Sequence, residues 1–187
     1  MMKQWALIAA LCVAPAALSA HAEIEKTASL GCGSNSICTY AWPKVAPPPG
    51  WHQDRDTSQE EDMNFMVPDG ATDSSAYIYA SAATDEDQAD TLAGFIADDK
   101  KTFLKDHPAM AMTDLASLTT ADGQVFPVVQ FDPPAGDDAR FDIVAYGEET
   151  DDEGNRYYLS FVVSGKTKAL RDANLAVFKA LVASYRK

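Results

Sequence analysis

The chain has 187 residues, and 28 Asp and Glu side chains outnumber 15 Lys and Arg side chains, which gives a formal net charge of -13 at pH 7. Such a charge repels nucleic-acid phosphates and anionic lipid headgroups, and the sequence contains no basic stripe that would offset the repulsion locally. Composition therefore disfavours nucleic-acid and membrane-surface functions. An acidic protein attracts cationic partners, so we expect a partner that is a protein and is itself cationic.

The first 22 residues have the features of a secretory signal peptide. Lys3 precedes an apolar run over residues 5–18, and Ala20-His21-Ala22 forms an A-x-A cleavage site. The run is too short to remain as a membrane anchor. We predict cleavage after Ala22, no membrane insertion, and a periplasmic or secreted mature protein.

Residues 23–56 form a predicted N-terminal arm that carries two cysteines. Cys32 and Cys38 are separated by a short segment rich in Gly, Ser and Asn. In an oxidising compartment this spacing predicts a disulfide. Closing so short a loop contributes about 2 kcal/mol, which orders the arm rather than holding the domain together.

The second half of the arm combines aromatic residues with prolines. Three consecutive prolines at residues 47–49 stiffen an extended path. A preorganised aromatic segment is suited to protein contacts, and the candidate interface consists of Tyr40, Trp42, Trp51 and His52. The alternative is that both tryptophans face inward and close the sheet.

Residues 57–187 are predicted to form a single domain. Alternation and turn signals predict two neighbouring strands over residues 63–67 and 75–83. A capping-box pattern at residues 84–87 predicts a helix over residues 86–105, ended by His107-Pro108. The buried stripe expected for this helix consists of Leu92, Phe95, Ile96, Phe103 and Leu104.

Four more strands and a second helix complete the predicted domain. Pro127 places its strand at a sheet edge or at a bulge. An amphipathic helix is predicted over residues 167–185, with Leu170, Asn174, Val177, Phe178, Leu181, Val182 and Tyr185 on one side. The four strands are predicted over residues 115–119, 125–131, 140–146 and 157–163.

This order of elements predicts an α+β fold, with a mostly antiparallel sheet of about six strands and two long helices packed on it. Short strings at residues 49–51, 67–70, 91–96, 122–124 and 144–149, with the closing helix, carry a resemblance over about residues 50–187. On these strings the chain resembles the Mog1/PsbP-like superfamily, which includes the DcrB-like exported bacterial proteins. The resemblance implies a sandwich of this kind and an adaptor, assembly or binding role without catalysis.

Two segments could hold metal ions. The acidic turn at residues 148–155 offers hard oxygen ligands for calcium, and the candidate ligands are Glu148, Glu149, Asp151 and Glu153. The alternative is a solvated hairpin. The string His107 to Met112 offers soft ligands for copper(I), namely His107, Met110 and Met112, whereas the alternative is that the methionines fill gaps in a helix-to-strand corner.

Enzymatic function has weaker support. Ser164-Gly165-Lys166-Thr167 resembles the end of a phosphate-binding loop, but Ser160 stands where the leading glycine is needed, so we expect Ser164 or Thr167 to cap the last helix. A hydrolase could use His52 or a pair of carboxylates.

Taken together, the residues favour a monomeric, exported binding protein without a cofactor, of the inhibitor or immunity type or an envelope assembly factor. The alternatives are a small calcium- or copper-binding periplasmic protein and, third, a hydrolase.

Overall fold

The computed structural model of the chain describes residues 24–30, 37–71, 75–84 and 91–186, and at residues 25–30 and 37–40 it describes the backbone alone. The predicted signal peptide and Cys32 lie outside these ranges, as do the side chains of Cys38 and Tyr40. The predicted disulfide therefore falls outside the described part of the protein. Among the described residues, no helix is both long and apolar enough to cross a membrane.

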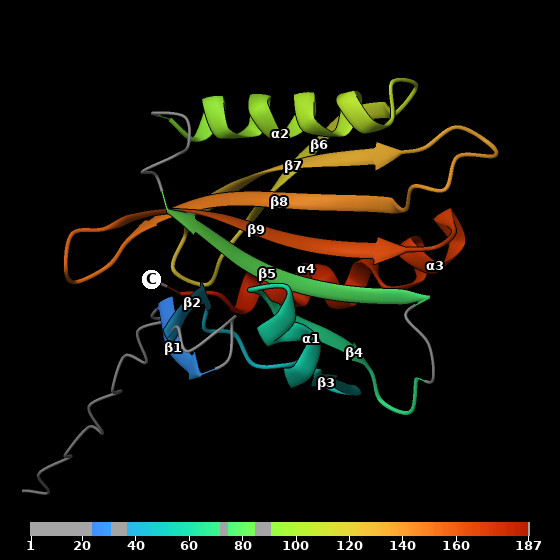
Figure 1. Cartoon of the computed structure of the whole chain (residues 1–187). Coiled ribbons are helices and arrows are strands. Elements are labelled where there is room, and N and C mark those ends of the chain that lie inside the picture. Colours follow the sequence, from blue (N-terminus) through green and yellow to red (C-terminus); the bar gives the residue numbers. More distant parts are fainter. Residues whose placement is uncertain (1–23, 31–36, 72–74, 85–90, 187) are drawn as a thin grey trace, which may run out of the picture.

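Seven strands form one open sheet in the order β3-β4-β5-β9-β8-β7-β6 (Figure 1), and each strand is antiparallel to its neighbours. The strands are β3 (Trp51–Gln53), β4 (Asn64–Pro68), β5 (Ala76–Thr84), β6 (Ala111–Thr119), β7 (Val125–Asp132), β8 (Phe141–Thr150) and β9 (Arg156–Gly165). A separate antiparallel pair is formed by β1 (Ile24–Leu30) and β2 (Ile37–Pro43). The helices are α1 (Arg55–Glu60), α2 (Leu92–Asp106), α3 (Lys168–Ala173) and α4 (Leu175–Ser184).

The α+β class and the antiparallel sheet are confirmed. Six of the seven sheet strands were predicted, and the seventh is β3, which lies inside the predicted N-terminal arm and pairs with β4. The sheet therefore begins before residue 57. In the described part of the chain, two helices have seven or more residues, α2 and α4.

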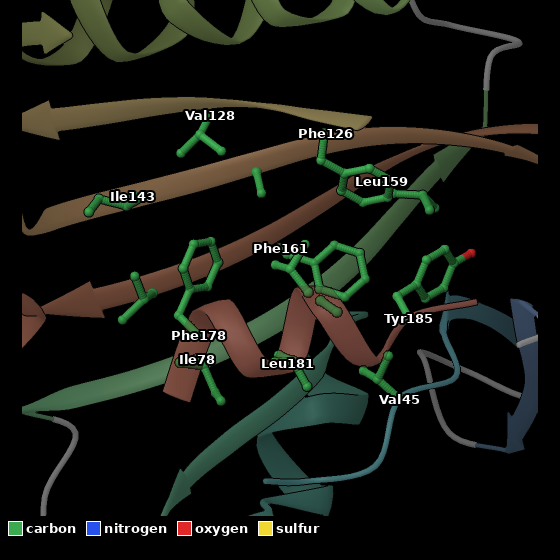
Figure 2. Close-up of a cluster of buried hydrophobic side chains, with 14 of the residues drawn as sticks. Val45, Ile78, Phe126, Val128, Ile143, Leu159, Phe161, Phe178, Leu181 and Tyr185 are labelled. Atoms are coloured by element: carbon green, nitrogen blue, oxygen red, sulfur yellow. The ribbon is translucent and has the colours of Figure 1, made fainter. Parts of the chain in front are cut away.

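The two faces of the sheet carry different cores. On one face, α4 packs with Phe178, Leu181 and Val182 against inward side chains of β5, β7, β8 and β9, and Val45 from the arm joins this core (Figure 2). On the other face, α2 packs with Leu92, Phe95, Ile96 and Phe103 on a smaller core. The molecule is thus a sheet covered by one longer helix on each face (Figure 1).

Helix α2 begins later than predicted. Thr84, taken as the start of the capping box, is the last residue of β5 and pairs with Tyr157 in β9. Because β5 stays paired with the central strand β9 as far as Thr84, this residue cannot begin the helix. The helix begins at Leu92 instead. Thr91 is its N-cap, and the Thr91 side chain accepts a hydrogen bond from the Gly94 amide at 3.1 Å.

The buried stripe of α2 and the residue at which the helix ends agree with the prediction, with one exception. Leu104 is exposed, because it follows the inward-facing Phe103 and one residue rotates about 100° around a helix. His107 is the C-cap, as predicted.

The prediction of a single closing helix over residues 167–185 was also wrong, because the segment is divided into α3 and α4 at Asn174. The Asn174 side-chain amide donates to the Leu170 carbonyl oxygen at 2.9 Å, and such local bonds compete with helix continuation. Thr167 caps α3 by accepting from the Leu170 amide at 3.2 Å, as expected for one of the two candidate caps.

Pro127 sits at a bulge, in agreement with one of its two predicted positions. The β6–β7 register shifts between Leu115, which faces Val128, and Leu118, which faces Phe126. One extra residue of β6 is accommodated opposite Pro127, where a missing amide hydrogen costs least. β7 itself is an interior strand, and the edge strand on this side of the sheet is β6.

Candidate functional site

Strand β6 is the long open edge of the sheet. It pairs with β7 on one side, and on its other side no strand of the described chain follows it. Seven of its nine residues are exposed, and only Met112 and Leu118 are half-buried. The opposite edge, β3, has three residues. An edge strand presents unpaired N–H and C=O groups that can pair with another chain, so β6 is the larger of the two edges on which this could happen.

The bulge divides this edge into two parts. Residues 111–115 keep a regular register with residues 128–132 of β7, and the shift comes after Leu115. Bulges locally disrupt pairing and twist an edge strand away from further partners. The regular part, residues 111–115, is therefore the part of β6 best suited to receive another strand.

The side chains along β6 are a mixture of small, apolar and acidic groups. Leu115 is 37% exposed, and the Asp114 side chain is 78% exposed although it forms an ion pair of 2.7 Å with Lys100 of α2. Strands that resist pairing carry lysine or proline on the edge. β6 carries neither.

Two acidic side chains lie on the α2 side of the sheet. The Tyr146 hydroxyl in β8 donates to Oδ2 of Asp99 in α2 at 2.5 Å. Burial raises the pKa of Asp99, and the Tyr146 hydrogen bond lowers it in part. Burial and the nearby Asp99 charge raise the pKa of Tyr146. This contact ties the middle of α2 to the centre of the sheet.

Asp142 is the second of these acids and faces Ser164 across the β8–β9 ladder. Arg140 Nε donates to Ser164 Oγ at 2.7 Å, and Asp142 accepts a side-chain hydrogen bond from Ser164. Burial raises the pKa of Asp142, and Ser164, Arg140 and Arg171 lower it in part. Its buried Oδ1 atom has no hydrogen-bond partner among the described residues.

Raised carboxyl pKa values favour the protonated form, a property of general acids. Asp99 and Asp142 are the two carboxyl groups on the α2 side of the sheet whose pKa is raised by burial. Both groups lie between packed elements, and sequence patterns did not single out either residue. A signal was available in the sequence, since Asp142 directly precedes the uncharged run Ile-Val-Ala-Tyr-Gly at residues 143–147.

Arg171 is the most deeply buried charged side chain described, at 1% exposed. It forms ion pairs with Asp132 and, at 2.9 Å, with Asp172. Lys168 lies 3.6 Å from Asp132. This network joins α3 to the end of β7 and satisfies the charge of Arg171, which indicates a structural role.

Each of the predicted copper ligands makes other contacts. Met110 and Met112 pack in the core between α2 and the sheet, which supports the alternative that they fill gaps. His107 turns instead to Asp137, with 2.8 Å between Nδ1 and Oδ1. One ligand atom each from His107, Asp137 and Asp138 lie within 4.8 Å of one another.

The predicted calcium ligands do not all lie on one face of the hairpin. β8 extends through Glu148 and Glu149, and Glu149 is buried whereas Glu148 is exposed and pairs with Arg156 at 3.0 Å. Asp151 accepts hydrogen bonds from the backbone amides of Glu153 and Asn155. The turn is thus shorter than predicted and uses Asp151 to close the hairpin.

The arm residues predicted as interface anchors separate into buried and exposed groups. Trp42 is 4% exposed and Trp51 packs on the core beside α4, so the inward alternative applies to both. His52 is exposed, and Asp69 at 3.0 Å is the one hydrogen-bond partner of its side chain among the described residues. A hydrolase using His52 would need a nucleophile that this pair does not supply.

The chain was compared with protein-family models, with curated proteins and with solved structures, and none of the three comparisons found a match.

Proposed function

We propose that the protein is an exported, non-catalytic binding module whose edge strand β6 pairs with an extended, basic segment of another envelope protein. One observation carries this proposal, namely a nine-residue edge strand that is largely exposed. Pairing of this kind adds a strand to a sheet through main-chain hydrogen bonds, and side chains at alternate positions then provide specificity.

The size of the edge is sufficient for weak to moderate binding. In an antiparallel strand about half of the residues direct their N–H and C=O groups to each side, so residues 111–115 offer about two or three outward residues. At about 1 kcal/mol net for each hydrogen bond, the backbone alone gives limited affinity. Side-chain contacts must supply the rest.

Charge favours a basic partner. Acidic side chains stand in the middle of β6 and beyond both ends, since Asp114, Asp106 and Asp122 are all exposed. Lys100 neutralises part of the charge of Asp114, but the whole chain remains at -13. Opposite charge increases the rate of association and favours the correct partner.

Export and the absence of catalysis are parts of the proposal that have support from sequence. The signal-peptide pattern of residues 1–22 supports an envelope location. The resemblance to Mog1/PsbP-like proteins supports an adaptor, assembly or binding role rather than a chemical one, and the acidity of the chain supports an inhibitor of a cationic enzyme. A cationic enzyme or assembly component is therefore the partner class to test.

The test combines a pull-down with two matched variants. Thr113→Lys adds a positive charge within the regular part of the β6 edge, where it repels a basic strand and blocks pairing. Thr102→Lys makes the same change on α2, two residues and about 200° around the helix from Lys100, and so away from β6. We expect a basic protein captured from envelope extract to be lost with Thr113→Lys and with high salt, and to be retained with Thr102→Lys.

Hydrogen exchange then locates the contact. Addition of the captured protein should slow exchange of backbone amides in residues 111–115. Equal capture by both lysine variants, or protection elsewhere without protection of β6, would show that the edge is not the binding surface.

A further inference from the structure

The corner that connects α2 to β6 brings together three potential metal ligands from distant parts of the sequence. His107 ends α2, whereas Asp137 and Asp138 belong to the connection between β7 and β8. The three ligand atoms lie within 4.8 Å of one another. The side chains of His107 and Asp137 are partly shielded, and Asp138 is exposed, so an ion could enter from the solvent side.

The spacing is close to that of a coordination sphere. Two ligands at 2.0–2.1 Å from a tetrahedral zinc ion are about 3.3 Å apart. His107 Nδ1 and Asp137 Oδ1 are 2.8 Å apart, so a small outward movement would admit an ion between them. Zinc accepts both imidazole nitrogen and carboxylate oxygen ligands, and three protein ligands leave its fourth tetrahedral position open.

Charge supplies a separate argument. The ion pair between His107 and Asp137 explains the position of those two groups, but it leaves the second carboxylate, Asp138, close to a group of like charge. The single His107 side chain can pair with only one of the two carboxylates, whereas a divalent cation neutralises both. The mixed nitrogen and oxygen donors also disfavour copper(I), which prefers sulfur, and calcium, which prefers six to eight oxygens.

We propose that His107, Asp137 and Asp138 form a site for a divalent transition-metal ion, with zinc as the best-suited metal. The ligand set differs from the predicted copper site in replacing two methionines with two aspartates. Bound metal would connect the end of α2 to the β7–β8 connection, next to the first residue of β6. The site does not depend on the proposed binding function.

Zinc binding to the full chain without a histidine tag provides the test. Zinc chloride is titrated into the protein by calorimetry, and thermal unfolding is followed with zinc, calcium and magnesium. We expect one zinc ion per chain at this site and a higher unfolding temperature with zinc, because an ion bound only by the folded state stabilises it. Calcium and magnesium should have little effect.

The matched variants are Asp138→Asn and Asp152→Asn, which remove one exposed carboxylate each, in the site and in the distant β8–β9 turn. Asp138→Asn should weaken zinc binding by about tenfold or more, since even residues that only support a ligand contribute about 10–100-fold, and Asp152→Asn should bind as the parent does. His107→Gln provides a second test at the nitrogen ligand. Equal zinc affinity of the parent, Asp138→Asn and His107→Gln, or a larger stabilisation by calcium than by zinc, would overturn the proposal.

Discussion

Substitution of Gly147 by alanine is a direct test of the core packing beside α4. A Cβ atom on Gly147 would lie 2.3, 2.6 and 2.7 Å from three ring carbons of Phe126. Phe126 is 1% exposed and packs against Phe161 and Tyr185, with ring centroids 5.7 and 6.0 Å away. The ring therefore has little room to move, and the substitution must displace several packed side chains.

The expected cost follows from two opposing terms. Overpacking of a tight core costs about 1–3 kcal/mol. The lower backbone entropy of alanine in the unfolded chain offsets about 0.4–1 kcal/mol of this, so we expect a net loss of about 1–2 kcal/mol. For a protein of this size, each kcal/mol lowers the unfolding temperature by about 2–4 °C, which gives a decrease of about 2–8 °C.

Urea unfolding of four proteins measures this effect and assigns its cause. The four are the parent, Gly147→Ala, Phe126→Leu and the double variant. The smaller leucine leaves room for the new methyl group, so the double variant should be more stable than the sum of the single effects predicts, by about 0.5 kcal/mol or more. A Gly147→Ala variant as stable as the parent, or strictly additive effects, would refute the reasoning.

Two further predictions concern buried charges. Because burial raises the pKa of Asp142, the folded state binds a proton more tightly than the unfolded state, and this group's contribution to stability decreases as pH rises from its unfolded value through its raised folded value. Asp142→Asn, which can still accept a hydrogen bond from Ser164, should therefore raise the unfolding temperature at pH 7–8. It should also make the unfolding temperature fall less between pH 4 and 8 than it does in the parent. An unchanged dependence on pH together with lower stability would contradict this. Arg171→Met should lower the free energy of unfolding by about 3 kcal/mol, since Asp132 loses a buried partner but keeps Lys168 nearby. Adding Asp132→Asn should recover part of this loss, as measured by urea unfolding. A double variant no more stable than Arg171→Met would argue against the ion pair as the cause.

The interior of the sheet could be predicted because its sequence pattern is nearly local. Eight of the ten residues of β9 are buried, and such a continuous apolar run is typical of a strand covered on both faces. β8 carries a similar run over residues 143–147. The hairpin between β6 and β7 likewise followed from Asp122-Gly123, where Gly123 has φ +89°.

Features that depend on distant residues could not be predicted in the same way. The start of α2 depends on how far β5 stays paired with β9. This pairing ends at Thr84, which faces Tyr157. The three residues of β3 are too short to show alternation, and they form a strand because β4 pairs with them. In both cases the ladder partner, rather than the local sequence, determines where the element lies.

The candidate sites depended on topology in the same manner. β6 and β7 were predicted as neighbours, but only the order of all seven strands shows that no other described strand pairs with the far side of β6. Pro127 pointed to an edge or a bulge, and the structure places the bulge opposite it on the edge strand. His107 was a candidate ligand from sequence, whereas its partners lie some thirty residues away in the β7–β8 connection.

Both proposed sites are in contact with α2, the helix that is held to the sheet less extensively. α4 contributes three fully buried side chains to its core, whereas α2 contributes none and rests on partly buried stacks, such as Phe103 on Phe131, and on the hydrogen bond from Tyr146 to Asp99. Regions with few buried apolar contacts open most readily, and Lys100 of this helix forms an ion pair with Asp114 of β6. An ion at His107 would restrain the end of α2 and the beginning of β6 together. Since binding costs less when the receiving strand is already ordered, metal at this corner would favour pairing at the β6 edge, even though neither site requires the other.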